Sequence, residues 1–507
     1  MSPSLLLPDD AKLRDLCGHI HQTWNTLTRD LCDALAAARD SKVEHEDATA
    51  AWPLYLSPRE DMEAVRETLA ASLAPAAFHR LSLRELPADW RAVTEHGLLY
   101  LPGKYVVPGG RFNEMHGWDS HFIVLGLLRS GRLDLARSMV DQQLYQIEHY
   151  GTILNANRTY FLTRSHPPFL GQTLLTVYRA KGDLEWLKNA LPLLEKYYFY
   201  WSVPPHHISS LGLARYCDFG DGPAPEVESS EKDEYGRTHY QRVAEYLRTL
   251  PAEASAAFLK EDGGLTDHAY RSDRSMRESG FDPGFRFGPL DLDTLNYIPV
   301  CLNTLLWRME TDIAAIRKIT GATATRGVWL DRAAQRREHL DRALWDEKDG
   351  LYYDYNLSTG QRSGFVFATT FWPLWAGLAS REQAAKVAAS LPHFETPGGI
   401  RTGPLETGCQ WDGPFGWAPI TLMAVQGLNR YGYREEARRI AVNFVRMVES
   451  EFTRTGHIFE KYDTVRLTSE VGALLRFGYP TNETGFGWTN AAVLELLHFL
   501  GMDVLGG

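Results

Sequence analysis

From residue 118 onward, the hydrophobic and polar positions repeat one pattern along the chain. A stretch that is apolar on nearly every side of a helix is followed by a turn and then by a helix with one apolar stripe. The apolar stretches are residues 118–130, 167–181, 293–319, 365–379, 414–431 and 484–501. The amphipathic stretches that follow all but the last are residues 134–148, 183–200, 329–345, 382–391 and 434–450. A helix that is apolar all round is buried, whereas one with a single stripe covers a core, so the pattern predicts two layers of helices.

Six such units predict an all-α (α/α)6 barrel, in which an inner ring of helices is enclosed by an outer ring. The units share this pattern without sharing sequence, so they repeat hydrophobicity and not residues. Residues 10–40 also read as a helix, with Asp9 or Asp10 as a candidate N-cap. This helix could supply the outer helix that the sixth unit lacks. An irregular helical bundle is the alternative arrangement.

We expect residues 106–507 to form the barrel and residues 1–105 to form a helical and extended segment packed on it. Residues 202–245 are rich in Pro, Gly, Asp and Glu, which is typical of a long insertion, and we expect them to form a lid. Residues 344–356 read as a helix end followed by a small β-hairpin. Long loops and small hairpins are therefore expected at one end of the barrel.

Composition narrows the class of protein. Hydrophobic residues make up 44% of the 507 positions and charged residues 23%, as in ordinary soluble proteins. The net charge of −11 and the lack of a basic stripe argue against binding to nucleic acid or anionic membranes. No stretch approaches the roughly 18 apolar residues that span a bilayer, and the first residues lack the basic start of a secretory signal. We therefore expect a cytoplasmic protein.

The five cysteines, at 17, 32, 217, 301 and 409, are scattered and odd in number. This spacing predicts neither a disulfide framework nor a metal cluster. No motif indicates an organic cofactor, so we expect neither metal nor cofactor. Nothing in the sequence specifies the oligomeric state.

Unusual residues gather in the loops before the predicted inner helices. These loops are PGGRFNEMHGWDS (108–120), NANRTYFLTRSHPPF (155–169), ESGFDPGFRFG (278–288), TGQRSG (359–364), ETGCQWDGPFGW (406–417) and EKYD (460–463) with TNETGFGW (481–488). In a barrel of this topology all of them reach the same end, where they would line one pocket. Aromatic residues are 12% of the chain, and aromatic rings suit sugars because the C–H face of a pyranose packs on them.

Two of these loops carry a family resemblance. PGGRFNEMHGWDS and QWDGPFGWAP (410–419) resemble the two signature motifs of trehalases, inverting glycoside hydrolases that cleave the α,α-1,1 bond of trehalose. ESGFD and EKYD are similar to the trehalase segments that carry the two catalytic carboxyl groups. The resemblance implies that Asp282 is the general acid and Glu460 the general base. It also implies that the bound glucose is held by Arg111, Trp118, Asp119, Asn155 and Arg164, joined by Trp411 and Asp412.

The residue types suit that chemistry. Inverting hydrolysis needs one protonated carboxyl group for the leaving oxygen and one ionised carboxylate that activates water from the opposite face. Asp282 lies between Phe281 and the run Pro283 to Phe285, where partial desolvation would favour its protonated form. Arginine and asparagine offer several donors to neighbouring sugar hydroxyls. An inverting pair is expected to stand about 6.5–9.5 Å apart, across the pocket mouth.

The chain departs from the trehalase pattern at several positions. Met115 and His116 stand where trehalases have an aromatic pair, and His166 stands where many have Gln. Ala224 stands where an Arg is lost, with Arg215 as a candidate replacement, and Thr484 replaces a common Glu. Several of these positions would contact the leaving sugar. The substrate is therefore expected to be trehalose or a related small α-glucoside such as glucosylglycerol.

Two other functional classes stay open from the sequence. A non-catalytic sugar-binding barrel is the main alternative, and the presence of both Asp282 and Glu460 argues against it. A related barrel enzyme, such as an epimerase or a polysaccharide lyase, would use histidine or tyrosine as its base. His121, His166 and His206 are the candidates for such a base.

Overall fold

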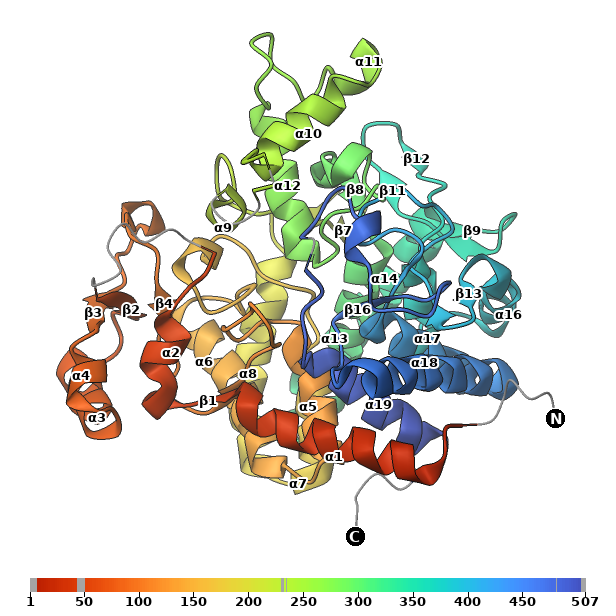
Figure 1. Cartoon of the computed structure of the whole chain (residues 1–507). Coiled ribbons are helices and arrows are strands. Elements are labelled where there is room, and N and C mark those ends of the chain that lie inside the picture. The colour runs from red at the N-terminus through yellow and green to blue at the C-terminus, as the bar shows by residue number, and fades with distance from the viewer. Residues whose placement is uncertain (1–6, 43–50, 229–231, 234, 480, 503–507) are drawn as a thin grey trace.

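The computed structural model describes residues 7–42, 51–228, 232–233, 235–479 and 481–502 (Figure 1). The predicted (α/α)6 barrel is confirmed. The inner helices are α5 (Asp119–Arg129), α7 (Leu170–Lys181), α13 (Val300–Ile319), α15 (Trp372–Ala376), α17 (Ala418–Arg430) and α19 (Gly487–Phe499). Each packs against the next, and α19 packs against α5, so the ring is closed.

The outer layer follows the same order in the chain. Its helices are α6 (Leu133–His149), α8 (Leu184–Trp201), α14 (Arg326–Leu344), α16 (Arg381–Ala389) and α18 (Arg434–Thr455). Helix α1 (Asp10–Leu27) begins at an N-cap in which the Asp9 carboxylate accepts from the Lys12 N–H at 2.9 Å. It packs against α18 and α19, and its Trp24 indole N–H donates to Ser130 Oγ at 2.9 Å, at the end of α5. The N-terminal helix thus covers the seam of the barrel.

Two inner elements are shorter than their apolar pattern predicts. The fourth begins as a 3-10 turn, Ala368–Phe371, and its α-helix ends at Gly377, which has a positive φ of 82°. The third begins only at Val300, because Pro299 precedes it in an extended conformation. Apolar side chains before these helices are buried as loops and short strands.

A small parallel sheet lies within the N-terminal segment that we expected to be helical and extended. Strand β2 (Trp52–Leu56) pairs with β3 (Leu81–Glu85) and with β4 (Leu98–Leu99). Helices α2 (Ala34–Ala38), α3 (Met62–Ser72) and α4 (Pro75–Phe78) complete this unit, and side chains of α2 and α3 share a separate core with the sheet. Strand β2 is buried along most of its length and shows a continuous apolar run instead of alternation, which is why the pattern gave no strand signal there.

The other strands are pairs of two or three residues at loop bases. They are β1 (Thr28–Arg29) with β5 (Tyr105–Val106), β6 (His207–Ile208) with β7 (Leu213–Ala214), β9 (Trp345–Asp346) with β10 (Leu351–Tyr352), and β13 (Glu395–Thr396) with β14 (Gly399–Ile400). A further sheet joins β8 (Tyr297–Ile298), β11 (Tyr355–Asn356) and β12 (Gln361–Arg362). The β9–β10 pair is the hairpin expected within residues 344–356.

The insertion between α8 and α13 extends well beyond residue 245. It contains α9 (Pro225–Glu228), α10 (His239–Leu247), α11 (Ala252–Ser255) and α12 (Asp267–Ser279). Helices α9, α10 and α12 share an apolar core of their own, to which Cys409 and Phe477 of distant loops also contribute. Figure 1 shows α10 and α11 projecting from one end of the barrel. Among the described residues, no helix is long and apolar enough to cross a membrane.

Close packing of α5 against α19 can be tested with two glycines that both lie inside helices. A Cβ at Gly126 of α5 would stand 2.7 Å from Ala491 Cβ and 2.8 Å from the Trp24 ring, whereas a Cβ at Gly18 of α1 would meet nothing within 4 Å. We expect Gly126→Ala to destabilise the protein by about 1–3 kcal/mol through overpacking. Gly18→Ala should stabilise it by about 0.4–1 kcal/mol. Melting temperatures that shift in the same direction for both variants would contradict this account.

Candidate active site

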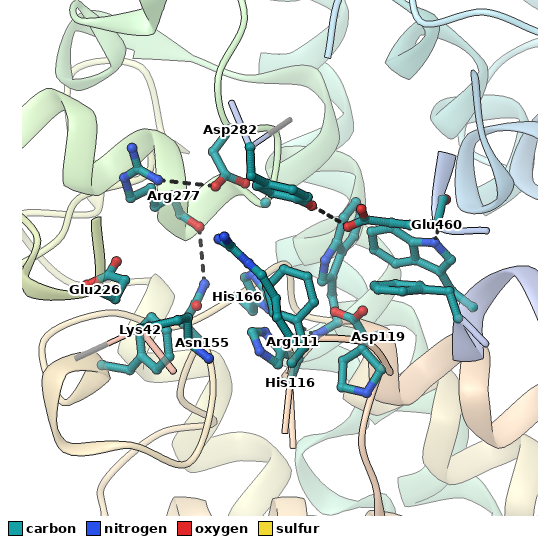
Figure 2. A pocket seen from close by; sticks show the side chains of 18 of the residues that line it. Lys42, Arg111, His116, Asp119, Asn155, His166, Glu226, Arg277, Asp282 and Glu460 are labelled. Carbon is teal, nitrogen blue, oxygen red and sulfur yellow. Dashed lines mark hydrogen bonds and ion pairs between the residues drawn. The ribbon is translucent and has the colours of Figure 1, made fainter. Parts of the chain in front are cut away.

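A single pocket lies where the loops before the inner helices converge (Figure 2). The space between its lining side chains, counted together with its opening to solvent, is about 720 Å³. Its lining comes from six separate parts of the chain, namely Lys42; Pro108, Arg111, Phe112, His116, Trp118 and Asp119; Asn155, Phe161, Arg164 and His166; Glu226, Val227, Arg277, Gly280 and Asp282; Trp411 and Trp417; and Glu460, Tyr479, Phe486 and Trp488. Of the predicted site residues, eight line this pocket: both carboxyl candidates, Arg111, Trp118, Asp119, Asn155, Arg164 and Trp411.

Asp282 reaches the pocket because α12 ends abruptly. Gly280 takes a positive φ of 75° at the end of the helix, and a Cβ there would stand 3.0 Å from the Trp118 ring. The Asp282 side chain is 32% exposed, so the desolvation expected from its aromatic neighbours is only partial without a ligand. Arg277 Nη1 lies 3.4 Å from Asp282 Oδ2, while its other nitrogens bind Asp273 at 3.0 and 3.1 Å. Arg277 therefore bridges two carboxylates.

Glu460 is held in a different environment, at the start of β16 (Lys461–Asp463). This strand pairs with β15 (Phe415–Trp417), which brings two motif loops together. The Glu460 side chain is buried, Lys461 Nζ lies 3.0 Å from its Oε2, and the Tyr479 hydroxyl donates to its Oε1. Burial raises the pKa of Glu460, which Lys461 and the Tyr479 hydroxyl oppose.

Asp119 is a further carboxyl group of the pocket, in the first turn of α5. Burial raises the pKa of Asp119 well above its usual range, and the negative charges of Glu460 and Asp282 raise it further. Figure 2 shows the carboxyl groups of Asp119, Asp282 and Glu460 facing the same space from different elements. Repulsion among their negative charges favours the state in which one of these carboxyl groups keeps its proton. A protonated carboxyl group is what general acid catalysis requires.

Aromatic rings form one wall of the pocket. Trp411 stacks on Trp417 with ring centroids 3.9 Å apart and planes within 3°. Trp118 meets Trp411, Trp488 and Phe281 with centroids 5.4–6.0 Å apart. All of these rings are buried, so they pack as a cluster and present a rigid surface on which an apolar sugar face could lie.

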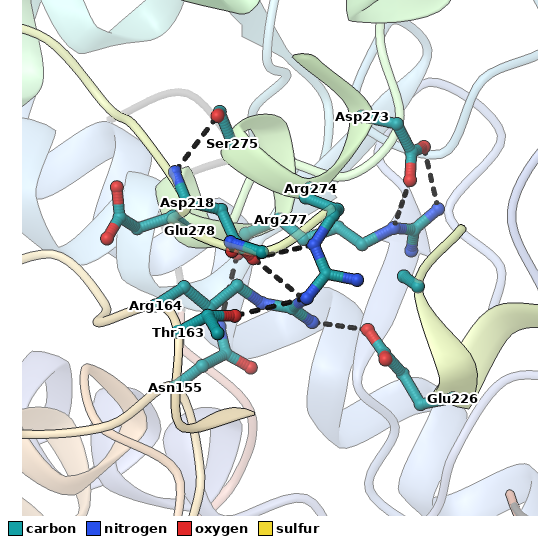
Figure 3. A network of polar contacts seen from close by, with 12 residues as sticks. Asn155, Thr163, Arg164, Asp218, Glu226, Asp273, Arg274, Ser275, Arg277 and Glu278 are labelled. Atoms are coloured by element: carbon teal, nitrogen blue, oxygen red, sulfur yellow. Dashed lines mark hydrogen bonds and ion pairs between the residues drawn. The ribbon is translucent and has the colours of Figure 1, made fainter. Parts of the chain in front are cut away.

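The polar side of the pocket is a network of arginines and carboxylates (Figure 3). Arg164 pairs with Glu226 of the insertion and lies 3.4 Å from Asp218. Asn155 Nδ2 donates to the Arg277 carbonyl at 3.1 Å, which links the loop before α7 to α12. Arg111 lies over the Tyr479 ring at 4.3 Å, and its backbone N–H donates to Glu483 at 2.9 Å. These contacts fix the donors before any ligand binds.

Arg215 and Asp412, which the sequence placed among the sugar contacts, do not line the pocket. Arg215 donates to the carbonyls of Pro205 at 3.1 Å and Leu295 at 2.6 Å, so its guanidinium ties loops together. The Asp412 carboxylate accepts from Thr407 Oγ1 at 2.6 Å, and burial raises the pKa of Asp412 to about 7. The ring of neighbouring Trp411 faces the pocket, whereas the Asp412 side chain is directed at Thr407.

Several lining residues were missed by the sequence reasoning. Arg277 directly precedes the ESGFD motif and could have been found from that position. Tyr479 lies beyond the EKYD segment, separated from it by a long loop. Glu226 was noted only as the end of a reduced motif. Lys42 had no signal, because it comes from the N-terminal segment and reaches the pocket by pairing with buried Glu114 at 2.6 Å.

The fold and the facing carboxyl groups are those of a glycoside hydrolase, and comparison with known proteins identifies the family. A family model described as Trehalase matches residues 4–501. The cytosolic neutral trehalase of Emericella nidulans is 35% identical over 94% of this chain and 71% of its own length. The corresponding protein of Neurospora crassa is 38% identical over 76% of this chain and 57% of its own length. The chain belongs to the trehalase family, as its two motifs predicted.

Solved structures agree with this assignment. The neutral trehalase Nth1 from Saccharomyces cerevisiae superimposes with a TM-score of 0.80 at 32% identity, over 96% of this chain and 94% of that one. A mannosylglycerate hydrolase of Thermus thermophilus superimposes with a TM-score of 0.52 at 18% identity, over 77% of this chain and 95% of that one. The second match shows the barrel fold alone.

The contrast between Arg111 and Arg215 gives a test of the pocket. We expect Arg111→Ala to weaken glucose binding at least about tenfold, since a hydrogen bond from a charged donor contributes about 1.5–3 kcal/mol. Arg215→Ala should leave glucose affinity unchanged and lower the melting temperature, because it removes two donors to loop carbonyls. Tryptophan fluorescence can follow the titration, because Trp118, Trp411, Trp417 and Trp488 line the pocket. Equal losses of affinity in the two variants would contradict this placement.

Proposed function

We propose that this chain hydrolyses α,α-trehalose to two molecules of glucose with inversion at the cleaved anomeric carbon. The observation that carries the proposal is the pair of carboxyl groups, Asp282 and Glu460, that line one pocket in different environments. The relatives described above are named neutral trehalases, which supports trehalose as the substrate. Their names also call them cytosolic, and on that ground we place this chain in the cytoplasm.

The proposed mechanism gives each carboxyl group one role. One glucose unit packs against the aromatic wall, with its hydroxyls on Arg111, Asp119, Asn155 and Arg164. Asp282, in its protonated form, gives its proton to the glycosidic oxygen as the bond breaks. Glu460, in its ionised form, takes a proton from the water that attacks the opposite face of the sugar.

The surroundings of the two groups suit these roles. The partly exposed Asp282 faces the space that the glycosidic oxygen would occupy, and a bound sugar would cover it. Arg277 is already bound through two nitrogens to Asp273, which attenuates its attraction for the ionised form of Asp282. Lys461 and the Tyr479 hydroxyl stabilise the ionised form of Glu460, while burial raises its pKa and makes it a stronger base than an exposed glutamate.

The positions that depart from the trehalase pattern give little support to a smaller leaving group. Met115 and Ala224 are buried in apolar cores, and Thr484 is exposed outside the pocket lining. Of the five altered positions, Met115, Ala224 and Thr484 lie outside the pocket lining, and His116 and His166 belong to it. We therefore propose trehalose ahead of glucosylglycerol.

The direct test is proton NMR of the products formed from trehalose in the first minutes, before mutarotation. Inversion at one anomeric carbon should release α-glucose and β-glucose in equal amounts, with the β-anomer coming from the cleaved side. Release of the α-anomer alone would rule out the mechanism. A higher kcat/KM for glucosylglycerol than for trehalose would instead overturn the substrate and leave the mechanism in place.

Replacing each carboxyl group should separate the two roles. We expect Asp282→Asn and Glu460→Gln each to lower kcat on trehalose by about 10²–10⁴-fold. With α-glucosyl fluoride, whose leaving group needs no proton, Asp282→Asn should recover most of its activity while Glu460→Gln stays inactive. Recovery by Glu460→Gln instead would mean that the two roles are reversed. Far-ultraviolet circular dichroism of both variants controls for folding.

A further inference from the structure

His116, Asp119 and His166 form a compact cluster within the sugar pocket. Each offers one ligand atom, a ring nitrogen or a carboxylate oxygen, and these three atoms lie within 4.8 Å of one another. All three residues are buried and line the pocket, as Figure 2 shows. Neither histidine belongs to the trehalase pattern, so the family's sugar chemistry does not account for their pairing.

Asp119 differs from the other carboxylates of this pocket in its partners. Asp282, Glu460 and Glu226 each lie within 4 Å of an arginine or lysine nitrogen, on Arg277, Lys461 and Arg164 respectively. Asp119 forms no ion pair within the part of the chain that the structure describes. A buried carboxylate is costly unless a cation or several donors compensate it. A bound cation beside Asp119 is one way to compensate its charge, and a proton on the carboxyl group is the other.

His116 has the outer contact that is typical of a metal ligand. Its Nε2 lies 3.0 Å from Glu114 Oε1, and Glu114 is in turn fixed by Lys42 at 2.6 Å and Arg158 at 2.9 Å. A carboxylate on one ring nitrogen orients the imidazole and raises the basicity of the other nitrogen. The Trp118 N–H lies 3.3 Å from His166 Nδ1, and metal binding through this ring would replace that hydrogen bond.

We propose that His116, Asp119 and His166 bind a divalent transition-metal ion, for which Zn²⁺ is the best match. Two imidazole nitrogens and one carboxylate oxygen are a common three-ligand set for Zn²⁺, and they leave a fourth position open toward the pocket. Mg²⁺ and Ca²⁺ prefer oxygen ligands alone and fit this set poorly. The donor atoms must draw together to reach about 2.0–2.2 Å from a common ion.

The site has a consequence for the enzyme. Asp119 is one of the residues predicted to hold the glucose, so metal and sugar compete for the same carboxylate. Binding of Zn²⁺ therefore excludes the glucoside, and the metal acts as a competitive inhibitor. This consequence rests on the proposed function, whereas metal binding itself does not.

Metal binding can be measured on the full chain without substrate, by calorimetry with Zn²⁺ and by visible absorption with Co²⁺ as a probe. The other candidate group among the described residues is Asp30, Cys32 and Asp33 at the surface, so Cys32→Ser serves as the background. We expect one site in the wild type and in Cys32→Ser. Adding His116→Phe or His166→Gln to the Cys32→Ser background should weaken Zn²⁺ binding by at least about 100-fold. Loss of a residue that only contacts a metal ligand costs less.

His79→Gln is the matched control, because His79 is exposed in the N-terminal unit and should not alter the affinity. Loss of binding in Cys32→Ser, or unchanged affinity in both pocket histidine variants, would overturn the site. If one histidine variant fails to fold, the other together with Asp119→Asn decides the outcome.

Competition is tested separately in the Asp282→Asn variant, which should bind trehalose without cleaving it. Saturating trehalose should raise the apparent Kd for Zn²⁺ at least about tenfold, as expected when two ligands share one site. An unchanged Kd at saturating trehalose would overturn the competition and leave the metal site standing. If the wild type fails to hydrolyse trehalose, the proposed function fails while the calorimetric result is unaffected.

Discussion

The contact between α5 and α19 closes the ring of inner helices, and the pocket depends on that closure. Gly126 of α5 lies against Ala491, and a Cβ on Gly487 would stand 2.9 Å from Ile123. Because these backbones approach so closely, the segments before the two helices also meet. The Gly487 N–H donates to the Pro108 carbonyl at 2.7 Å. Packing at the seam thereby joins the first and the last motif loops around one cavity.

Around that cavity, charge is compensated by pairing instead of by solvent. Arg277 holds Asp273 and Asp282 together, and Arg164 lies between Glu226 and Asp218. Removing one member of such a pair would leave a buried charge without compensation, which is why these networks keep donors in fixed positions. The insertion contributes to this order, since Glu226 and α12 belong to it. A pocket built in this way offers oriented donors to a sugar without reorganising.

The hydrophobic pattern of the chain was most reliable for the helices of the barrel. Each inner or outer helix has a local signature, because the side chains that share its face are three or four residues apart in the sequence. The sheet formed by β2, β3 and β4 has no such signature, since each strand is short and is completed by partners far along the chain. The short fourth inner helix shows the same limit, because apolar residues before it are buried without being helical. Local periodicity thus predicted which segments are buried better than it predicted their conformation.

For the site, the sequence determined which loops carry polar and aromatic residues and, through two rare motifs, which carboxyl groups to examine. Only the tertiary structure decided which side chains face the pocket. Trp411 lines it and Asp412 does not, because side chains next to each other along the chain leave the backbone in different directions. Lys42 and Tyr479 reach it from segments with no motif. His116 and His166 lie in different loops, and pairing of the loops before α5 and α7 brings His166 beside His116 and Asp119, so no spacing along the chain could predict the metal site that we propose.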